Sequence, residues 1–255
     1  MKKSISVQFL GWTFAIAIVG WGTCVVFSLL GFSLNKDYWM YLPYLTGGLS
    51  PTIASYIVLK RNGRVSGITE WLKNIFDVKK PAWMYVFTGV LLLGYFIPLI
   101  VIFGITEMQP VYMLFVLMPL MLFFGGLEEA GWRYILQPEL DRRVGFLSAC
   151  LIVSVIWAVW HLPLFFIAGT GQDAMDFWPF ALGGVGLTFA LGALRRITGS
   201  VFLCVVFHSM INAGRGVFVV KDTFWGAAVT AALLAAMSIL AVALHKRKPQ
   251  KAEVE

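Results

Sequence analysis

Residues 111–136 read VYMLFVLMPLMLFFGGLEEAGWRYIL. The stretch exceeds the ~20 apolar residues that a membrane-crossing helix needs, yet it contains Glu128, Glu129 and Arg133. Each charge near a bilayer centre costs about 2.5–3.5 kcal/mol on insertion scales, so three cost about 8–10 kcal/mol. This is comparable to the net stability of a typical domain, about 5–15 kcal/mol. Such charges indicate a functional site, with a structural ion pair between helices as the alternative.

The composition is that of a polytopic membrane protein. The chain is 59% hydrophobic and only 13% charged, with a mean hydropathy of +0.81. Soluble domains have about 45–50% apolar and about 25% charged residues. The net charge of +7 would suggest nucleic acid as a partner in a soluble chain. In a membrane protein the positive-inside rule explains it better, so we expect the bilayer and no nucleic acid.

Eight apolar segments approach the length of a membrane-crossing helix. They lie near residues 8–32, 40–60, 83–105, 111–136, 145–168, 177–195, 198–220 and 223–245. The predicted fold class is therefore all-α, a bundle of about eight transmembrane helices. We expect residues 1–255 to form a single transmembrane domain.

Basic residues alternate between the connecting segments. One side of the predicted bundle holds Lys2, Lys3, Lys60, Arg61, Arg64, Lys73, Lys79, Lys80, Arg142, Arg143, Arg195, Arg196, Lys246, Arg247, Lys248 and Lys251. The other side holds Lys36, Arg215 and Lys221. Because cytoplasmic loops are enriched in Lys and Arg, this bias predicts that both termini face the cytoplasm. We expect a multi-pass protein of a bacterial cell membrane.

The longest polar connection contains the pattern of an amphipathic helix. Ile68, Trp71, Leu72, Ile75 and Phe76 recur at the spacing of an amphipathic helix. Nearby lysines favour a position at the membrane surface, where the helix packs under the bundle or guides a substrate.

The three cysteines, Cys24, Cys150 and Cys204, form no C-x-x-C pair. We therefore expect small, free apolar side chains.

Two of the three histidines, His161 and His208, lie inside apolar segments. Trp157 and Asn212 each lie four residues from one of them, hence on the same helix face. A rise of 1.5 Å per residue places Glu128 and His208 about 14–15 Å from the expected cytoplasmic ends of their helices, but His161 at about 24 Å. Either the fifth segment tilts or begins below the membrane plane, or these residues do not form one site.

A proline follows the first of these histidines. Pro163 has no N–H, so the carbonyl of Val159 is expected to be free as a polar group, or to mark a kink.

The spacing of the acidic motif assigns different partners to its two glutamates. Glu129 and Arg133 are four residues apart, in the order that favours an ion pair along a helix. Glu128 faces about 100° away and is left for other partners. A carboxylate held in this way is suited to general-base catalysis.

These residues resemble the motifs of the CPBP intramembrane proteases, which include CAAX prenyl endopeptidases and the bacteriocin-processing or immunity (Abi) proteins. Glu128-Glu129-Ala-Gly-Trp-Arg133 resembles E-E-x-x-x-R, and Trp157-Ala-Val-Trp-His161 resembles F-x-x-x-H with Trp for Phe. His208-Ser-Met-Ile-Asn212 resembles H-x-x-x-N. The resemblance covers residues 118–214.

The resemblance implies an intramembrane endopeptidase. Glu128 would activate a water with help from His161. His208 and Asn212 would support the site as oxyanion donors, while Glu129 and Arg133 would stabilise it. It also implies a membrane-associated substrate, lipidated or not, cut near the cytoplasmic face. Prenylated CAAX proteins, bacteriocin precursors and membrane-bound regulators all fit.

Several alternatives stay open. Glu128, His161 and His208 could ligate a catalytic zinc ion with water as the fourth ligand, but there is no H-E-x-x-H helix, so we favour a site without a cofactor. A proton-coupled transporter would also use intramembrane Glu and His, although no inverted repeat is visible. A non-catalytic immunity or scaffold protein is the other alternative.

Gly183, Gly184 and Gly186 are expected to allow close helix packing, with a substrate groove as the alternative.

Overall fold

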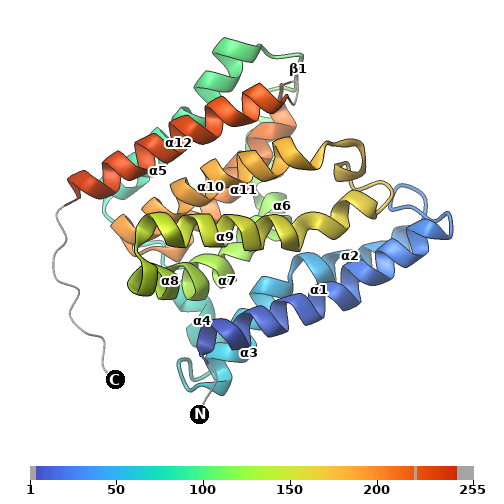
Figure 1. Cartoon of the computed structure of the whole chain (residues 1–255), viewed down its shortest axis with the longest axis horizontal. Coiled ribbons are helices and arrows are strands. Elements are labelled where there is room, and N and C mark those ends of the chain that lie inside the picture. Colours follow the sequence, from blue (N-terminus) through green and yellow to red (C-terminus); the bar gives the residue numbers. More distant parts are fainter. Residues whose placement is uncertain (1–3, 221–222, 246–255) are drawn as a thin grey trace.

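The computed structural model describes residues 4–220 and 223–245, and helices make up nearly all of it (Figure 1). The described residues contain one small sheet, in which β1 (Glu107–Met108) pairs antiparallel with β2 (Phe218–Val219). The prediction of an all-α polytopic membrane protein is confirmed. Seven of the basic residues counted above lie outside the described residues: Lys2, Lys3, Lys221, Lys246, Arg247, Lys248 and Lys251.

All eight apolar segments are helical, but they differ in regularity. Five helical stretches within the described residues are long and apolar enough to cross a membrane. They are α1 (Ile5–Leu29), α5 with η2 (Ala82–Pro98, Leu99–Phe103), α9 with η5 (Phe146–His161, Leu162–Phe166), α10 (Phe177–Thr198) and α12 (Phe224–Leu244). The protein is therefore an integral, multi-pass membrane protein.

The other three segments are bent, broken or short. The fourth consists of α6 (Met113–Phe123) and a helical stretch over Gly126–Val144, bent by 41°. The second divides at Leu49 into α2 (Tyr41–Gly48) and α3 (Ser50–Arg61), and a 3₁₀ turn, η1 (Tyr38–Met40), precedes it. The seventh is α11 (Val201–Val217), of 17 residues. Two of these three irregular segments, the bent one and α11, carry two of the three motifs, while the third motif lies on α9.

Local sequence explains the tight connection between α10 and α11. Gly199 ends α10 in the left-handed conformation, at φ 66°, which glycine adopts without a steric penalty. The next residue, Ser200, caps α11 by accepting a hydrogen bond of 3.2 Å from the backbone N–H of Leu203. This turn connects α10 directly to the histidine-bearing helix α11, and the two helices contact each other.

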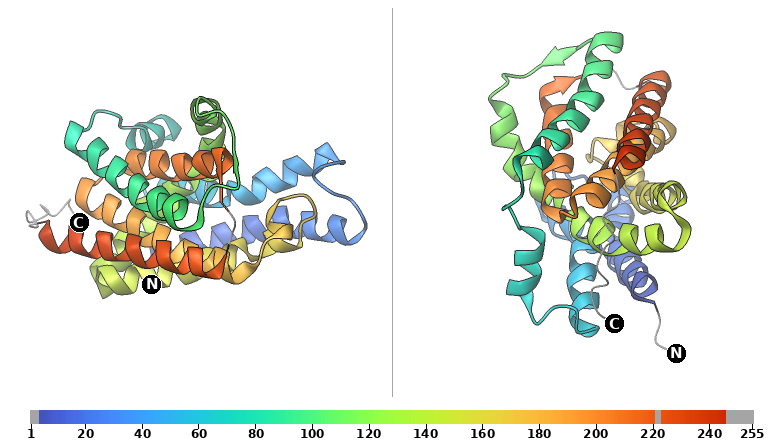
Figure 2. Two further views of the ribbon diagram at one scale, coloured as in Figure 1. Left: turned by 90° about the horizontal axis from the view of Figure 1, so that it is seen from above. Right: turned by 90° about the vertical axis from the view of Figure 1, so that its left-hand side faces the viewer.

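The connections lie at two ends of the molecule (Figures 1 and 2). The segment 62–81 and the turns at Gly145 and Gly199 lie toward one end, which we call the basic end. The connections 30–40, 104–112 and 167–176 and the residues 218–220 lie toward the opposite end. A 3₁₀ turn, η6 (Gln172–Ala174), lies in the third of these.

The predicted amphipathic helix is present as α4 (Ile68–Ile75). Trp71 and Ile75 are buried, and the indole N–H of Trp71 donates a 3.1 Å hydrogen bond to Oγ of Ser55 on α3. Ile68 and Leu72 are exposed. One apolar face thus packs under the bundle, as expected.

All three cysteines are free and buried, which confirms the prediction made for them. Cys24 lies on α1, Cys150 on α9 and Cys204 on α11. The protein is therefore held together by helix packing, without a disulfide bond.

Candidate active site

The acidic motif lies just after a break in its helix. Gly125 separates α6 from η3 (Gly126–Glu128) at φ 137°, a value that residues with a Cβ rarely adopt. A Cβ on Gly125 would overlap the amide of Asn212 and lie 3.1 Å from Nε2 of His208. The break is therefore shaped to fit the side chains of α11.

The helix after the break changes its winding three times. After η3 follow α7 (Glu129–Gly131), a π-helical turn η4 (Trp132–Leu136) and α8 (Gln137–Val144). Single π turns within helices are frequent at functional sites. This winding places Glu128 and Glu129 in different environments.

Glu129 is fully buried and lies between two basic side chains. Its Oε1 is 2.8 Å from Nδ1 of His208, and its Oε2 is 3.1 Å from Nη1 of Arg133. The predicted contact between Glu129 and Arg133 is confirmed. The contact with His208 was not predicted, because nothing in the sequence indicates which face of α11 approaches α7.

Glu128, by contrast, lies at the edge of a cavity and is 8% exposed. Nε1 of Trp157 donates a 3.1 Å hydrogen bond to its Oε2. The expectation that Glu128 has partners other than Arg133 is confirmed. Sequence reasoning missed Trp157 as one of them, although tryptophan in place of phenylalanine was the available signal, since only the indole has an N–H.

His161 is the last residue of α9 and lies among aromatic rings. Its ring centroid is 3.8 Å from that of Trp157, 4.5 Å from Trp160 and 5.2 Å from Phe180. Its Nδ1 is 2.9 Å from the carbonyl oxygen of Trp157. A carbonyl can only accept, so Nδ1 carries the hydrogen and Nε2 of a neutral ring is an acceptor.

The expectation of a free carbonyl at Val159 is wrong. The chain tightens into the 3₁₀ turn η5 after His161, and the backbone N–H of Leu162 donates to the oxygen of Val159. A bond three residues along thus replaces the one that Pro163 cannot make.

Despite the mismatch in expected depth, Glu128 and His161 line the same cavity. The expected depth of Glu128 is too small because the predicted segment ends at residue 136, whereas the helix continues through α8 to Val144. Counted from the turn at Gly145, Glu128 is 17 residues away and His161 is 16. Both distances correspond to about 25 Å of helix, so the two residues lie at the same level of a helical hairpin.

Asn212 holds the break in place. Its Nδ2 donates a 2.9 Å hydrogen bond to the carbonyl oxygen of Phe124, next to Gly125. The amide has a second N–H, which this contact does not use. Asn212 lies one helical turn from His208, as its spacing predicted.

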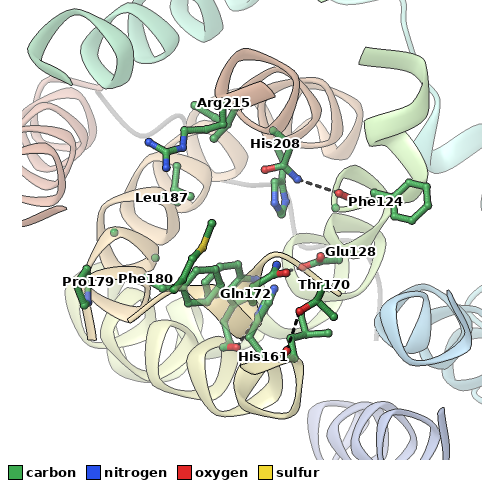
Figure 3. Close-up of a pocket in the computed structure, with 18 of the residues that line it drawn as sticks. Phe124, Glu128, His161, Thr170, Gln172, Pro179, Phe180, Leu187, His208 and Arg215 are labelled. Atoms are coloured by element: carbon green, nitrogen blue, oxygen red, sulfur yellow. Dashed lines mark hydrogen bonds between the residues drawn. The ribbon is translucent and has the colours of Figure 1, made fainter. Parts of the chain in front are cut away.

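The four residues Glu128, His161, His208 and Asn212 line one cavity of about 570 Å³. Glu128, His161 and His208 approach it from different sides (Figure 3). Its walls also contain the aromatic side chains of Trp21, Tyr44, Tyr95, Phe124, Trp157 and Phe180. Glu129 and Arg133 do not line it. This volume is typical of ligand sites, which measure about 300–1,000 Å³.

The proposed zinc ligands do not form a metal-binding group. Within residues 4–220 and 223–245, no three His, Cys, Asp or Glu side chains are grouped so that they could hold a metal ion. The geometry therefore does not support Glu128, His161 and His208 as a ligand set.

The three glycines near the start of α10, Gly183, Gly184 and Gly186, differ in their surroundings. A Cβ on Gly184 would lie 2.7 Å from the ring of Trp157, and one on Gly186 would lie 2.6 Å from the backbone of Ala231. A Cβ on Gly183 would meet nothing within 4 Å, and Gly183 lines the cavity. Close packing is confirmed for Gly184 and Gly186 and is wrong for Gly183.

Comparison with known proteins covers the same region. A family model described as type II CAAX prenyl endopeptidase Rce1-like matches residues 109–214. This range includes all three motifs and every residue that the resemblance singled out. Residues 109–214 of the chain are therefore similar to the CPBP/CAAX protease family.

A relative extends the similarity beyond the motifs. A protein named CAAX prenyl protease 2, from Methanococcus maripaludis, is 24% identical over 245 positions. The match covers 83% of this chain and 84% of the relative. The similarity to this relative therefore extends well beyond the three motifs.

Proposed function

We propose that the protein is an intramembrane endopeptidase in which Glu128 activates the attacking water. The observation that carries the proposal is that the two adjacent glutamates have different contacts. Glu129 is fixed by Arg133 and His208, while Glu128 lies at the cavity with one oxygen held by Trp157. A general base needs a carboxylate within reach of the water and of the scissile bond.

The hydrolysis uses the cavity residues in named roles. Glu128 takes a proton from water as the oxygen attacks the peptide carbonyl carbon, and Nε2 of His161 accepts the second O–H of that water. The carbonyl π electrons move to oxygen, giving a tetrahedral oxyanion. The protonated Glu128 then gives its proton to the leaving nitrogen as the C–N bond breaks, which restores the carboxylate.

The oxyanion needs donors placed before the reaction. His208 acts as a donor when its ring carries both hydrogens: Nδ1–H then faces Glu129, and Nε2–H lies beside Gly125 at the cavity. The second N–H of Asn212 is the other candidate donor. Fixed donors of this kind contribute about 10²–10³ in rate each in soluble proteases.

The substrate we propose is a membrane-associated polypeptide with an apolar segment, lipidated or not. The family description and the name of the relative both refer to prenylated CAAX proteins. The aromatic walls suit an apolar chain of either kind.

A cleavage assay in detergent tests the proposal. The purified protein is mixed with quenched-fluorescent, apolar peptides, prenylated and unprenylated, without any ion gradient. We expect cleavage of at least one class and none above background with Glu128→Gln. A transporter or a non-catalytic scaffold would cleave neither class, and that result would refute the proposal.

A further inference from the structure

The cavity lies in only one half of the helix bundle. On the last four long helices, its lining residues fall within 157–164 at the end of α9 and in η5, 179–187 in the first half of α10, 208–215 in the second half of α11 and 226–230 at the start of α12. Each of these stretches is the part of its helix that lies away from the basic end.

The connections at that opposite end also contribute to the cavity. Thr170, Gln172, Ala174, Met175 and Asp176, from the connection between α9 and α10, line it. Thr223, just before α12, does so as well. None of its lining residues comes from segment 62–81 or from the turns at Gly145 and Gly199. The cavity therefore reaches the surface at the end opposite the basic one.

The half of the bundle toward the basic end is tightly packed. Trp132, Leu136, Cys150, Leu194 and Leu203 are each no more than 1% exposed. These residues come from η4, α9, α10 and α11, the same elements that supply the site. A substrate that approached from the basic end would have to displace this core.

The described charges identify the membrane side of each end. The packed end carries ten described basic residues: Lys60, Arg61, Arg64, Lys73, Lys79, Lys80, Arg142, Arg143, Arg195 and Arg196. The open end carries two, Lys36 and Arg215. Such an asymmetry places the packed end in the cytoplasm.

We propose that the substrate reaches Glu128 from the extracytoplasmic side and is an apolar segment of an exported or membrane-anchored polypeptide. This inference rests on the proposed peptidase function. It differs from the expectation, based on family resemblance, of cleavage near the cytoplasmic face. A cytoplasmic protein with a lipidated tail would meet the packed, basic end of the bundle.

Cysteine labelling tests the orientation without any activity. The native cysteines are buried, so they give little background labelling. Ala174→Cys, at the cavity mouth, and Arg64→Cys, at the basic end, are both exposed positions. In intact cells a membrane-impermeant maleimide should label Ala174→Cys and should label Arg64→Cys only after permeabilisation. The reverse pattern overturns the proposal.

A second pair of variants keeps the labelling test decisive. Lys36→Cys replaces Ala174→Cys if the latter does not accumulate, since Lys36 is exposed at the same end. Lys79→Cys replaces Arg64→Cys in the same way.

A sided cleavage assay then tests access. Membrane-impermeant quenched peptides with an apolar stretch are added to right-side-out or inverted vesicles that contain the protein. We expect cleavage by the right-side-out vesicles at least ten times faster, and none with Glu128→Gln. Cleavage only by inverted vesicles overturns the inference but leaves the peptidase intact. Absence of cleavage even in detergent refutes the peptidase function, while the labelling result still decides the orientation.

Discussion

Oε1 of Glu129 and Nδ1 of His208 are 2.8 Å apart, although the two residues are separated by 79 positions in the chain. The contact joins the irregular helix after Gly125 to α11, and both side chains are buried. It occupies one oxygen of Glu129, while Arg133 faces the other. Glu128, its neighbour, makes neither contact and lies at the cavity instead.

Substitutions in the buried pair of Glu129 and Arg133 should lower the stability of the protein, and activity should be lost as a consequence. Glu129→Gln leaves Arg133 without its counter-charge, and breaking a buried pair costs about 3–5 kcal/mol in soluble proteins. We expect Glu129→Gln and Arg133→Met each to lower the melting temperature in detergent and the yield of folded protein.

The double variant Glu129→Gln, Arg133→Met should be more stable than the sum of the single losses predicts, because both charges are gone. Melting curves of all four proteins measure this coupling. Strictly additive losses would show that the two charges do not stabilise each other.

Trp157→Phe should slow cleavage while leaving the fold intact. Phenylalanine keeps an aromatic ring near Phe180, whose centroid is 5.2 Å from that of Trp157, but it cannot donate to Glu128. A hydrogen bond to a charged group contributes about 1.5–3 kcal/mol, so kcat should fall about 10- to 100-fold with little change in KM.

Trp160→Phe is the matched control. It also removes an indole N–H, which donates to Oγ of Ser50 at 3.0 Å, but Trp160 does not line the cavity. Its kcat should stay within about threefold of the wild type. Equal losses in both variants would mean that the contact with Glu128 has no particular role.

Gly125→Ala should disrupt the site from the backbone. The added Cβ is strained at φ 137° and overlaps Asn212. We expect cleavage to fall by at least about 10²-fold, because a misplacement of about 1 Å has that effect on catalysis. Gly22→Ala on α1 adds a methyl group with no atom within 4 Å and should behave as the wild type. A fully active Gly125→Ala protein would show that the break does not position the site.

The sequence predicted the helical segments and the partners that lie close along one helix. Glu129 and Arg133 share a helix, so their spacing alone predicts the pair. The contacts of Glu129 with His208 and of Glu128 with Trp157 depend on how separate helices pack, which periodicity does not specify. The 3₁₀ and π turns around residues 126–136 also escaped prediction. So did the extension of the helix through α8, whose length sets the level of Glu128 relative to His161.

Removal of metal ions should leave cleavage unchanged if Glu128 activates water without one. The motivation is the lack of a metal-binding group among the described residues and of an H-E-x-x-H helix in the sequence. Cleavage is measured before and after dialysis against a chelator, with elemental analysis of the same samples. Activity that is lost to the chelator and restored by zinc, with one zinc per chain, would require a metal mechanism.

The comparison of Glu128→Gln with Glu129→Gln tests the central assignment most directly. Both variants keep the shape of the side chain and remove one charge, and the two positions are adjacent. Melting temperature and peptide cleavage rate are measured on the same detergent preparations. We predict that Glu128→Gln melts like the wild type and loses at least the ~10²–10⁴-fold of a missing general base, whereas Glu129→Gln is unstable. A stable but inactive Glu129→Gln beside an unstable Glu128→Gln would contradict the assignment and reverse the two roles.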